Sequence, residues 1–229
     1  MEERFYAQSR SAVGSFFAKV FGWMGLGLGI TTLVAFAVAT SPKAISLVFG
    51  SSFVLILLVI AQLALVAGLS WRINKMSVST ALGMFFLYTA LSGMTLSSVL
   101  LIYTSASLLS AFVVAVGMFA AMAVYGSVTK TDLTPMGTFL SMSLFGLIIA
   151  LVINMFVRSQ TFDLMTAIIG AIIFALFTAF DIQRLKAFAQ QSQLHSEEGN
   201  RIAVIGALML YLDFINLLLS LIRIMGKQK

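Results

Sequence analysis

The sequence predicts an all-α polytopic membrane protein with seven transmembrane helices, the seventh of them central. Of its 229 residues, 60% are hydrophobic and only 10% are charged, whereas soluble domains carry about 25% charged residues. The mean hydropathy is +1.05, and long charge-free runs alternate with short polar segments. Polar side chains recur on one face of the last run. We therefore expect a single seven-helix transmembrane domain over residues 1–229.

The charge-free runs give the expected spans in order. One spanning helix needs about 20 apolar residues, and we expect residues 1–15 to form a cytoplasmic tail. The uncharged run from Met76 to Thr129 is too long for one helix and divides at the polar cluster Tyr103 to Ser107. Thr134-Pro135 suits the start of the fifth span, because proline fits the first helical turn. The expected spans are residues 16–40, 47–70, 78–102, 106–127, 134–156, 162–182 and 203–224.

The positions of lysine and arginine predict the orientation, because these residues are enriched in cytoplasmic loops. With the N-terminus inside, the outer loops carry only Lys43 and Arg158, although Lys227 and Lys229 of the C-terminal tail would lie outside against the trend. The inner segments carry Arg4, Arg10, Lys19, Arg72, Lys75, Lys130, Arg184, Lys186 and Arg201. We expect a cytoplasmic N-terminus. The net charge of +6 then reflects topology and not nucleic-acid binding, which would gather the charges in one patch.

The residue types exclude several kinds of chemistry. There is no cysteine, which excludes disulfides, thiol catalysis and thiolate metal sites. The start M-E-E-R carries two glutamates where a secretory signal has its basic region, so we expect the first apolar segment to remain as a span. The single histidine, His195, lies in the long hydrophilic connection from Gln183 to Arg201. A solvated loop residue is favoured there over a metal ligand or a pH sensor.

Two aspartates stand apart from the other acidic residues. Asp181 and Asp213 fall in or against apolar runs, whereas the other acids fall in tails or loops: Glu2, Glu3, Asp132, Asp163, Glu197 and Glu198. A carboxylate at the bilayer centre costs roughly 2.5–3.5 kcal/mol on insertion scales. An ionisable residue inside a span therefore marks a functional site by default.

The last span carries its polar residues with helical spacing. At about 100° per residue, one face of this helix holds Asp213 together with Gly206, Asn216, Ser220 and Arg223. Such a face must lie against protein or a water-filled cavity, because lipid does not satisfy polar groups. This predicts that the seventh helix is central, and that Asn216, Ser220 and Arg223 line a pathway.

Whether the two aspartates meet depends on helix depth. At 1.5 Å rise per residue, Asp181 lies roughly 27 Å inward of Asp163, and Asp213 about 15 Å inward of Arg223. The aspartates meet only if Arg223 is itself buried a turn or two below the outer surface. Two such carboxylates cannot both ionise cheaply, so they share one proton and titrate as a pair. A pair of this kind is a proton sensor and a ligand pair for a hard cation such as calcium.

Plain structural interpretations of the two aspartates stay open. Asp181 is one turn before Arg184 and close to Lys186, so a helix-end ion pair explains it as well. Asp213 alone is also explained by a structural hydrogen bond to a serine or tyrosine of another helix.

Four stretches together resemble the Bax inhibitor-1 family, the transmembrane Bax inhibitor motif proteins, and bacterial inner-membrane members most of all. They are S-G-M-T-L-S-S (Ser92 to Ser98), T-K-T-D-L (Thr129 to Leu133), A-F-D-I-Q-R-L-K (Ala179 to Lys186) and L-Y-L-D-F-I-N-L (Leu210 to Leu217). The likeness covers nearly the whole chain, from the first span to Gly226.

The resemblance implies six helices around a central seventh and a pH-sensitive calcium leak governed by an aspartate pair, which matches Asp181 and Asp213. It also implies a basic latch at the inner end of span two, for which we assign Arg72, with Lys75 as a rival. Arg223 matches a family arginine, but span two offers only Gln62 as an interior polar group and no acidic partner. The expected partners are the lipid bilayer, calcium ions and protons; we expect no cofactor, no nucleic acid and no enzymatic activity.

Four other functions compete with the calcium leak. An intramembrane aspartyl protease needs G-x-G-D and P-A-L motifs, and a retinal pump needs a lysine inside span seven; neither pattern occurs. A membrane protein that restrains another membrane machine, such as a protease or stress regulator, without transport is the stronger alternative. A proton-coupled transporter of another solute is the fourth. Flux in purified liposomes separates the leak from the partner protein, and dependence on an imposed proton gradient separates the transporter from the leak.

Overall fold

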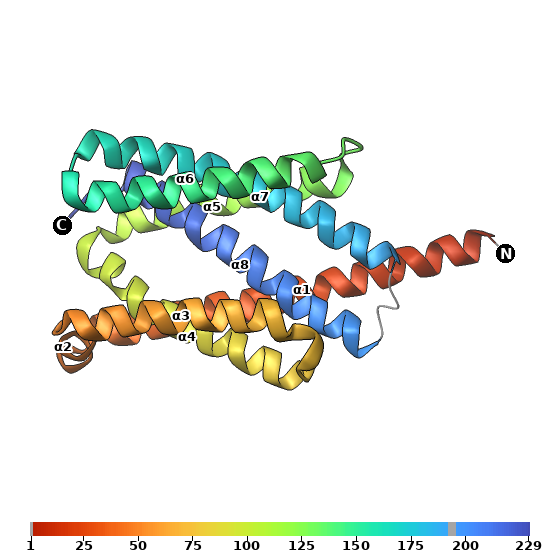
Figure 1. The fold of residues 1–229 in the computed structure, drawn as a ribbon, viewed down its shortest axis with the longest axis horizontal. Coiled ribbons are helices and arrows are strands. Elements are labelled where there is room, and N and C mark those ends of the chain that lie inside the picture. Colours follow the sequence, from red (N-terminus) through yellow and green to blue (C-terminus); the bar gives the residue numbers. More distant parts are fainter. Residues whose placement is uncertain (1, 192–195) are drawn as a thin grey trace. The chain divides into compact units, whose positions relative to one another are not determined.

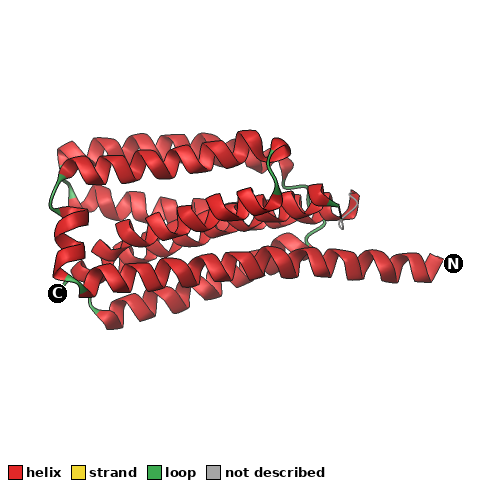
Figure 2. Cartoon of the chain, turned by 90° about the horizontal axis from the view of Figure 1, so that it is seen from below, coloured by secondary structure: helices red, strands yellow, loops and turns green. Residues whose placement is uncertain are grey.

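The computed structural model describes residues 2–191 and 196–229 of the chain, and within these ranges the regular elements are all helices (Figures 1 and 2). His195 lies outside the described residues. In chain order the helices are α1 (Glu2–Thr40), α2 (Pro42–Phe49), α3 (Ser52–Arg72), the 3-10 turn η1 (Ile73–Lys75), α4 (Val78–Ile102), α5 (Ser105–Val128), α6 (Thr134–Val157), α7 (Gln160–Gln191) and α8 (Glu197–Met225).

The prediction of seven spans is confirmed. Among the described residues, seven helical stretches are long and apolar enough to cross a membrane. Each of the expected spans matches one of them, with differences at the ends. The stretches are Ala12–Thr40, Ser52–Lys75, Val78–Ile102, Ser105–Val128, Thr134–Val157, Gln160–Gln190 and Glu197–Met225.

The second expected span begins later than the sequence analysis placed it, because a separate short helix, α2, precedes it. The Ser41 hydroxyl accepts a hydrogen bond from the Ala44 amide, and Pro42 occupies the first turn of α2. The Ser51 hydroxyl caps α3 in the same way, by accepting from the Phe53 amide. Serine caps of this kind start helices, so the apolar run divides into two helices.

Helix α7 continues past the expected end of the sixth span at residue 182 and reaches Gln191. The added residues include Arg184, Lys186 and Ala187, which are all strong helix formers. Charged residues end an apolar run but do not end a helix. The polar connection that the sequence places from Gln183 onward is therefore largely helical.

The chain forms two compact units. One comprises residues 1–102 with Phe188–Tyr211, and the other Tyr103–Ala187 with Leu212–Lys229. Helix α8 is continuous through Tyr211 and Leu212 (Figure 1), so it contributes to both units.

In the first unit, α1 and α4 approach closely at a glycine. A Cβ atom on Gly93 would lie 2.6 Å from the Thr31 carbonyl oxygen, so only glycine allows this approach, as is common in membrane helix packing. Buried hydroxyl groups join the same helices: the Thr31 hydroxyl donates to the Thr89 carbonyl oxygen at 2.8 Å and pairs with the Tyr211 hydroxyl of α8 at 2.7 Å.

In the second unit, small residues set α5, α6 and α8 against α7. A Cβ on Gly126 of α5 would overlap the Ala179 carbonyl oxygen, and one on Gly170 would lie 2.8 Å from the Ser220 hydroxyl of α8. The C-terminal tail is fastened to the turn between α4 and α5. The Thr104 amide donates to the Lys227 carbonyl oxygen at 3.1 Å, and Tyr103 and Gln228 form an isolated antiparallel β-bridge.

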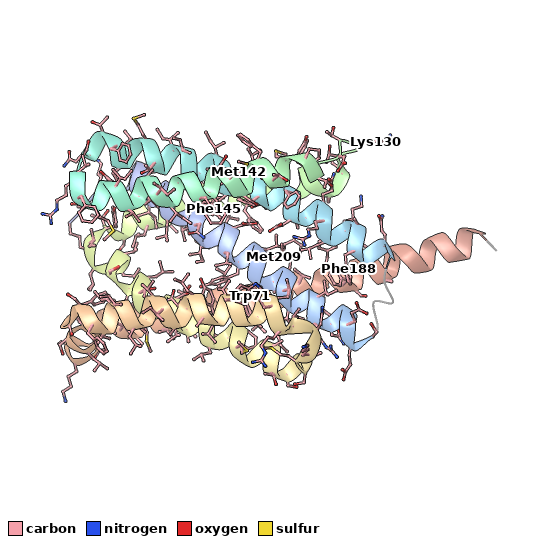
Figure 3. All side chains as sticks on the ribbon, viewed as in Figure 1. Trp71, Lys130, Met142, Phe145, Phe188 and Met209 are labelled. Atoms are coloured by element: carbon pink, nitrogen blue, oxygen red, sulfur yellow. The ribbon has the colours of Figure 1, made fainter. Side chains whose placement is uncertain are left out.

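Burial separates the last two helices from the others. Among the described spans, 61% of the most apolar stretch is buried in α7 and in α8, against 6–33% in the other five. The other helices expose large apolar side chains, such as Trp71, Met142 and Phe145 (Figure 3). The sequence predicted a buried α8; the structure adds that α7 is buried equally.

Candidate functional site

The candidate site is an acid pair in the second unit. Asp181 of α7 and Asp213 of α8 are 5% and 6% exposed, and their carboxyl groups are hydrogen-bonded to each other. The Asp213 Oδ2 atom is buried and has no hydrogen-bond partner among the described residues. Since an ionised carboxylate only accepts hydrogen bonds, a carboxyl–carboxyl hydrogen bond requires a proton on one of the two groups.

Helix α5 packs against both helices that carry the pair. Next to Asp213, the ring of Phe214 packs edge-on against Phe112 and Phe119 of α5, with centroids 5.9 and 5.6 Å away. Two residues before Asp181, the backbone of Ala179 touches Gly126 of α5. Helix α5 therefore supports both helices of the pair with close contacts, which leaves the carboxyl groups in a low-dielectric environment.

Arg223 finds its acidic partner on α7 and not on the second span, where the sequence analysis looked for one. Its guanidinium donates to the Asp163 carboxylate at 3.1 Å, and the two side chains are 24% and 42% exposed. Asp163 lies in the first turn of α7 and Arg223 in the last turn of α8. Because consecutive antiparallel helices bring these turns together, this signal was available in the sequence and was missed.

The ion pair Asp163–Arg223 and the acid pair Asp181–Asp213 both form, although helical rise alone puts the aspartates about 12 Å apart in depth. A partly buried arginine accounts for some of this difference, because its long side chain reaches along the helix. Packed helices also cross at an angle, so equal depth at one end does not persist along their length. The Arg223 side chain is 24% exposed; that it lies a turn or two below the outer membrane surface stays a prediction.

A cation lies close to Asp181 on the same helix. Arg184, one turn beyond Asp181 on α7, is close enough to act electrostatically on that carboxyl group. Lys186 instead donates to the Ser127 carbonyl oxygen at the end of α5, at 2.5 Å. The helix-end interpretation offered Arg184 and Lys186 as cations for Asp181. Of these two, only Arg184 acts on the Asp181 carboxyl group.

Gln183 ties α7 to the loop between α5 and α6. Its side-chain oxygen accepts from the Leu133 amide and its side-chain nitrogen donates to the Thr131 carbonyl oxygen, each at 2.8 Å. The T-K-T-D-L and A-F-D-I-Q-R-L-K stretches therefore contact each other directly. Leu133 and Gln183, which form one of these bonds, are 50 residues apart in the sequence. The loop is fastened two residues away from Asp181.

The other residues predicted for the site lie as follows. Ser220 is buried at 1% exposure, and the Asn216 side chain donates to the Leu212 carbonyl oxygen of its own helix at 2.8 Å. Arg72 ends α3 in the first unit and its side chain is exposed. Its role as a latch for Asp181 stays a prediction, as does the role of Asn216 and Ser220 in a pathway.

The donor set suits a passing or weakly held cation better than a tight metal site. Among the residues that the structure describes, no group of three or more histidine, cysteine or acidic side chains gathers. Calcium takes six to eight oxygen ligands, and the pair supplies four oxygens, of which one mutual hydrogen bond occupies two. Binding calcium would break that hydrogen bond and release its proton.

A buried hydroxyl cluster on the other side of α8 was not predicted. Tyr211, fully buried, bonds Thr31 and Ser92, and Tyr88 also bonds Ser92. Ser92 opens the S-G-M-T-L-S-S stretch, whose repeated hydroxyl residues were the available signal. Tyr211 precedes Asp213 by two residues, which places the two side chains on nearly opposite faces of α8.

Comparison with known proteins agrees with this fold and these motifs. The profile of the family described as "Inhibitor of apoptosis-promoting Bax1" matches residues 13–229. The chain is 43% identical to the inner membrane protein YbhL of Escherichia coli strain K12 over 223 residues, which cover 97% of this chain and 95% of the relative. It is 42% identical over 214 residues to an uncharacterized protein of Borreliella burgdorferi, covering 93% and 92% of the two chains. An uncharacterized protein of Deinococcus radiodurans is 39% identical over 212 residues, covering 93% and 90%. With a match that spans both aspartate helices and nearly the full length, the chain belongs to the Bax inhibitor-1 family of membrane proteins.

Proposed function

We propose that this membrane protein is a pH-sensitive calcium leak channel gated by Asp181 and Asp213. The observation that carries the proposal is the hydrogen bond between two buried carboxyl groups on adjacent helices. A buried acid pair needs a functional reason, because apolar residues in the same place would cost less to insert. The chain has the channel-like character of its family, and the acid pair is its chemically distinctive feature.

The gate works through charge. While the pair carries net negative charge, it attracts the basic groups of the inner end, with Arg72 as the latch and Arg184 already beside Asp181. Full protonation removes that charge and weakens the attraction, so the helices at the inner mouth can separate. Calcium then passes down its gradient. Asn216, Ser220 and Arg223 line the outer part of the route, and the Asp163–Arg223 ion pair belongs to the same outer end.

The proposed location is a bacterial inner membrane with the N-terminus in the cytoplasm. The E. coli relative is named an inner membrane protein, and the basic residues favour this orientation. Acidification of the cytoplasmic side then protonates the pair, in which Asp181 lies nearer the inner end of α7 and Asp213 near the middle of α8, and calcium flows inward.

Calcium flux in proteoliposomes tests the proposal. Purified wild-type protein is reconstituted with a calcium dye inside, and flux is recorded between about pH 5.5 and 8. We expect flux to rise as the pH falls in the wild type. Asp213→Asn and Asp181→Asn remove the coupled titration, so their flux no longer follows the wild-type pH dependence. Asp132→Asn, the same change at an exposed acid, keeps it. Equal flux at every pH from wild type and Asp213→Asn would refute the gate.

A second candidate function rests on α3. Its apolar stretch is only 6% buried, and Gln62 in the middle of that stretch reaches the Leu91 carbonyl oxygen at 3.4 Å. An exposed span of this kind offers a face on which another membrane protein can pack. In this alternative the protein modulates a membrane protease or stress regulator without transport. Purified protein that gives no flux above empty liposomes, at any pH, favours it over the channel.

A further inference from the structure

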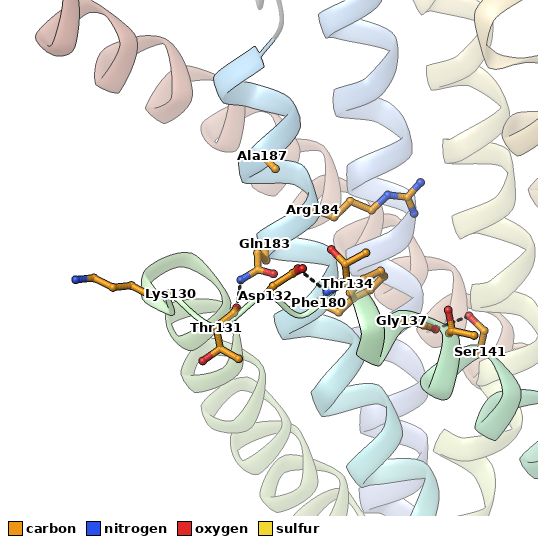
Figure 4. Close-up of a pocket in the computed structure, with 11 residues that line it drawn as sticks. Lys130, Thr131, Asp132, Thr134, Gly137, Ser141, Phe180, Gln183, Arg184 and Ala187 are labelled. Carbon is orange, nitrogen blue, oxygen red and sulfur yellow. Dashed lines mark hydrogen bonds between the residues drawn. The ribbon is translucent and has the colours of Figure 1, made fainter.

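A cavity with several polar and charged side chains in its lining opens at the start of α6 and the end of α7, beside the acid pair but distinct from it. Its volume is about 780 Å³. It is lined by the loop between α5 and α6, the first two turns of α6 and the last turns of α7, within the second unit (Figure 4). Its lining combines two cations, Lys130 and Arg184, one carboxylate, Asp132, and a set of hydroxyl groups, Thr131, Thr134, Thr138 and Ser141.

The charges of the lining leave Arg184 as the group available to a ligand. Asp132 already accepts hydrogen bonds from the side chain and backbone of Thr134. Its carboxylate is therefore engaged in capping the first turn of α6. Lys130 points away from the other lining residues (Figure 4). Within the described residues, Arg184 makes no hydrogen bond and no ion pair at contact distance, and its side chain is exposed. Because Asp132 is already engaged by Thr134, the available Arg184 guanidinium favours an anion as the ligand.

The surroundings favour an anion that carries hydrocarbon chains. The cavity lies at the ends of two membrane-spanning helices, and Phe180 and Gly137 form its floor. Next to the lining residues Thr138 and Ser141, α6 presents Phe139 and Met142, which are 64% and 70% exposed. These side chains face the lipid hydrocarbon in a membrane protein. A phospholipid whose headgroup enters the cavity therefore has its acyl chains beside an apolar helix surface.

We propose that this cavity binds the phosphate of an anionic phospholipid headgroup, with Arg184 as the anchoring cation and the free hydroxyl of Thr138 as a second donor. An arginine guanidinium suits phosphate because its fixed fork of donors matches two oxygens. The site does not depend on calcium transport. It does share one group with the acid pair, since Arg184 acts on Asp181 from the same turn of α7. A headgroup and the Asp181 carboxyl therefore compete for one guanidinium.

Native mass spectrometry of the full-length protein in neutral detergent tests the site. The probes are phosphatidylglycerol and phosphatidylcholine with the same acyl chains. We expect the wild type to bind phosphatidylglycerol more tightly. Arg184→Gln should weaken that binding by about tenfold, as for the loss of one charge-assisted pair, and Arg184→Lys should restore part of it. Arg158→Gln, the same charge change just beyond the other end of α6, should leave it unchanged. No lipid preference, or an equal loss in the Arg158 variant, overturns the proposal.

Two further arms separate lipid from free phosphate and test the competition. Inorganic phosphate and glycerol phosphate are added at the concentration of the lipid; displacement of phosphatidylglycerol by either at this ratio shows that the ligand is a soluble phosphate and overturns the lipid assignment. Asp181→Asn removes the competing carboxyl group, so we expect tighter binding of phosphatidylglycerol. Unchanged binding in this variant overturns the competition for Arg184. Both readouts are independent of flux, so they hold whether or not the protein conducts calcium.

Discussion

Single residues decide how closely the helices of this protein approach, and the acid pair depends on that approach. Small residues set the helices of the pair in place: Gly126 of α5 touches Ala179 of α7, and Gly170 of α7 lies against Ser220 of α8. In a membrane, van der Waals contact between helices takes over much of the role of the hydrophobic effect. A methyl group at the wrong glycine therefore acts directly on the distance between the carboxyl groups.

Two glycines of α5 make a matched test of this point. Gly126→Ala would place a Cβ atom against the Ala179 carbonyl oxygen, whereas a Cβ on Gly117 has no neighbour within 4 Å. We expect Gly126→Ala to destabilise the fold by about 1–3 kcal/mol, since backbone cannot move aside as a side chain can. Gly117→Ala should be neutral or stabilising by up to about 1 kcal/mol. Thermal unfolding in detergent measures both, and equal effects would contradict the contact.

Asp132 provides a pH-dependent effect outside the membrane spans. Hydrogen bonds from the side chain and the backbone of Thr134 lower the pKa of Asp132 below its usual value. A lowered folded-state pKa gives stability that is present above the unfolded pKa of about 3.9 and is lost as the pH falls through the folded value. We expect Asp132→Ala to melt below the wild type at pH 7, with the gap closing below about pH 4.

Asp132→Asn is the control for that experiment, because it keeps an acceptor for the Thr134 amide but cannot titrate. Its melting temperature relative to Asp132→Ala should stay constant with pH. A wild-type advantage over Asp132→Ala that persists unchanged well below pH 4 would show that the carboxylate charge plays no part in starting α6.

At the scale of elements, the two most buried spans, α7 and α8, carry the two candidate aspartates. The sequence located these two helices through their aspartates, and charge-free runs located every span. It missed α2 as a separate helix, although Ser41-Pro42 at its start and Gly50-Ser51 after its end give capping signals that hydropathy alone ignores. It also ended the sixth span too early, because a change in polarity is not a change in helix propensity. The Asp181–Asp213 contact was stated only conditionally, since helical rise cannot give the crossing angle of two helices.

The contact between the first turn of α7 and the last turn of α8 gives a prediction about how these two helices are held together. The Asp163–Arg223 ion pair is only partly exposed, at 42% and 24%, and it joins the first turn of one helix to the last turn of the next. A double-mutant cycle with Asp163→Asn and Arg223→Gln should give a coupling energy of about 0.5–1 kcal/mol. Unfolding in detergent supplies the four stabilities. Additive effects would mean that the two side chains act independently and that Arg223 has another partner.

For the whole molecule, an odd number of candidate spans predicts that the two termini lie on opposite sides of the membrane. The C-terminal tail pairs with the turn between α4 and α5, which holds the end of α8 next to the start of α5. The charge pattern could not decide this alone, because Lys227 and Lys229 opposed it. A backbone hydrogen bond from Thr104 to Lys227 is invisible to any count of charges.

Labelling of single cysteines tests the orientation, and the absence of native cysteine makes the background clean. In intact spheroplasts, a membrane-impermeant maleimide should label Lys43→Cys and Gln228→Cys. Lys130→Cys, in the loop between α5 and α6, should react only after the membrane is permeabilised. The reverse pattern would place the N-terminus outside and the inner end of the acid pair in the periplasm.

The fastened tail has a practical consequence for anyone who purifies this protein. The last residues do not hang free: Lys227 bonds both Thr104 and Ser107, and Gln228 bridges Tyr103. An affinity handle or fluorescent reporter fused directly after Lys229 would strain the turn between α4 and α5, to which the tail is hydrogen-bonded. Fusion at the N-terminus, or a long flexible spacer after Lys229, should leave the hydrogen bonds of the tail intact.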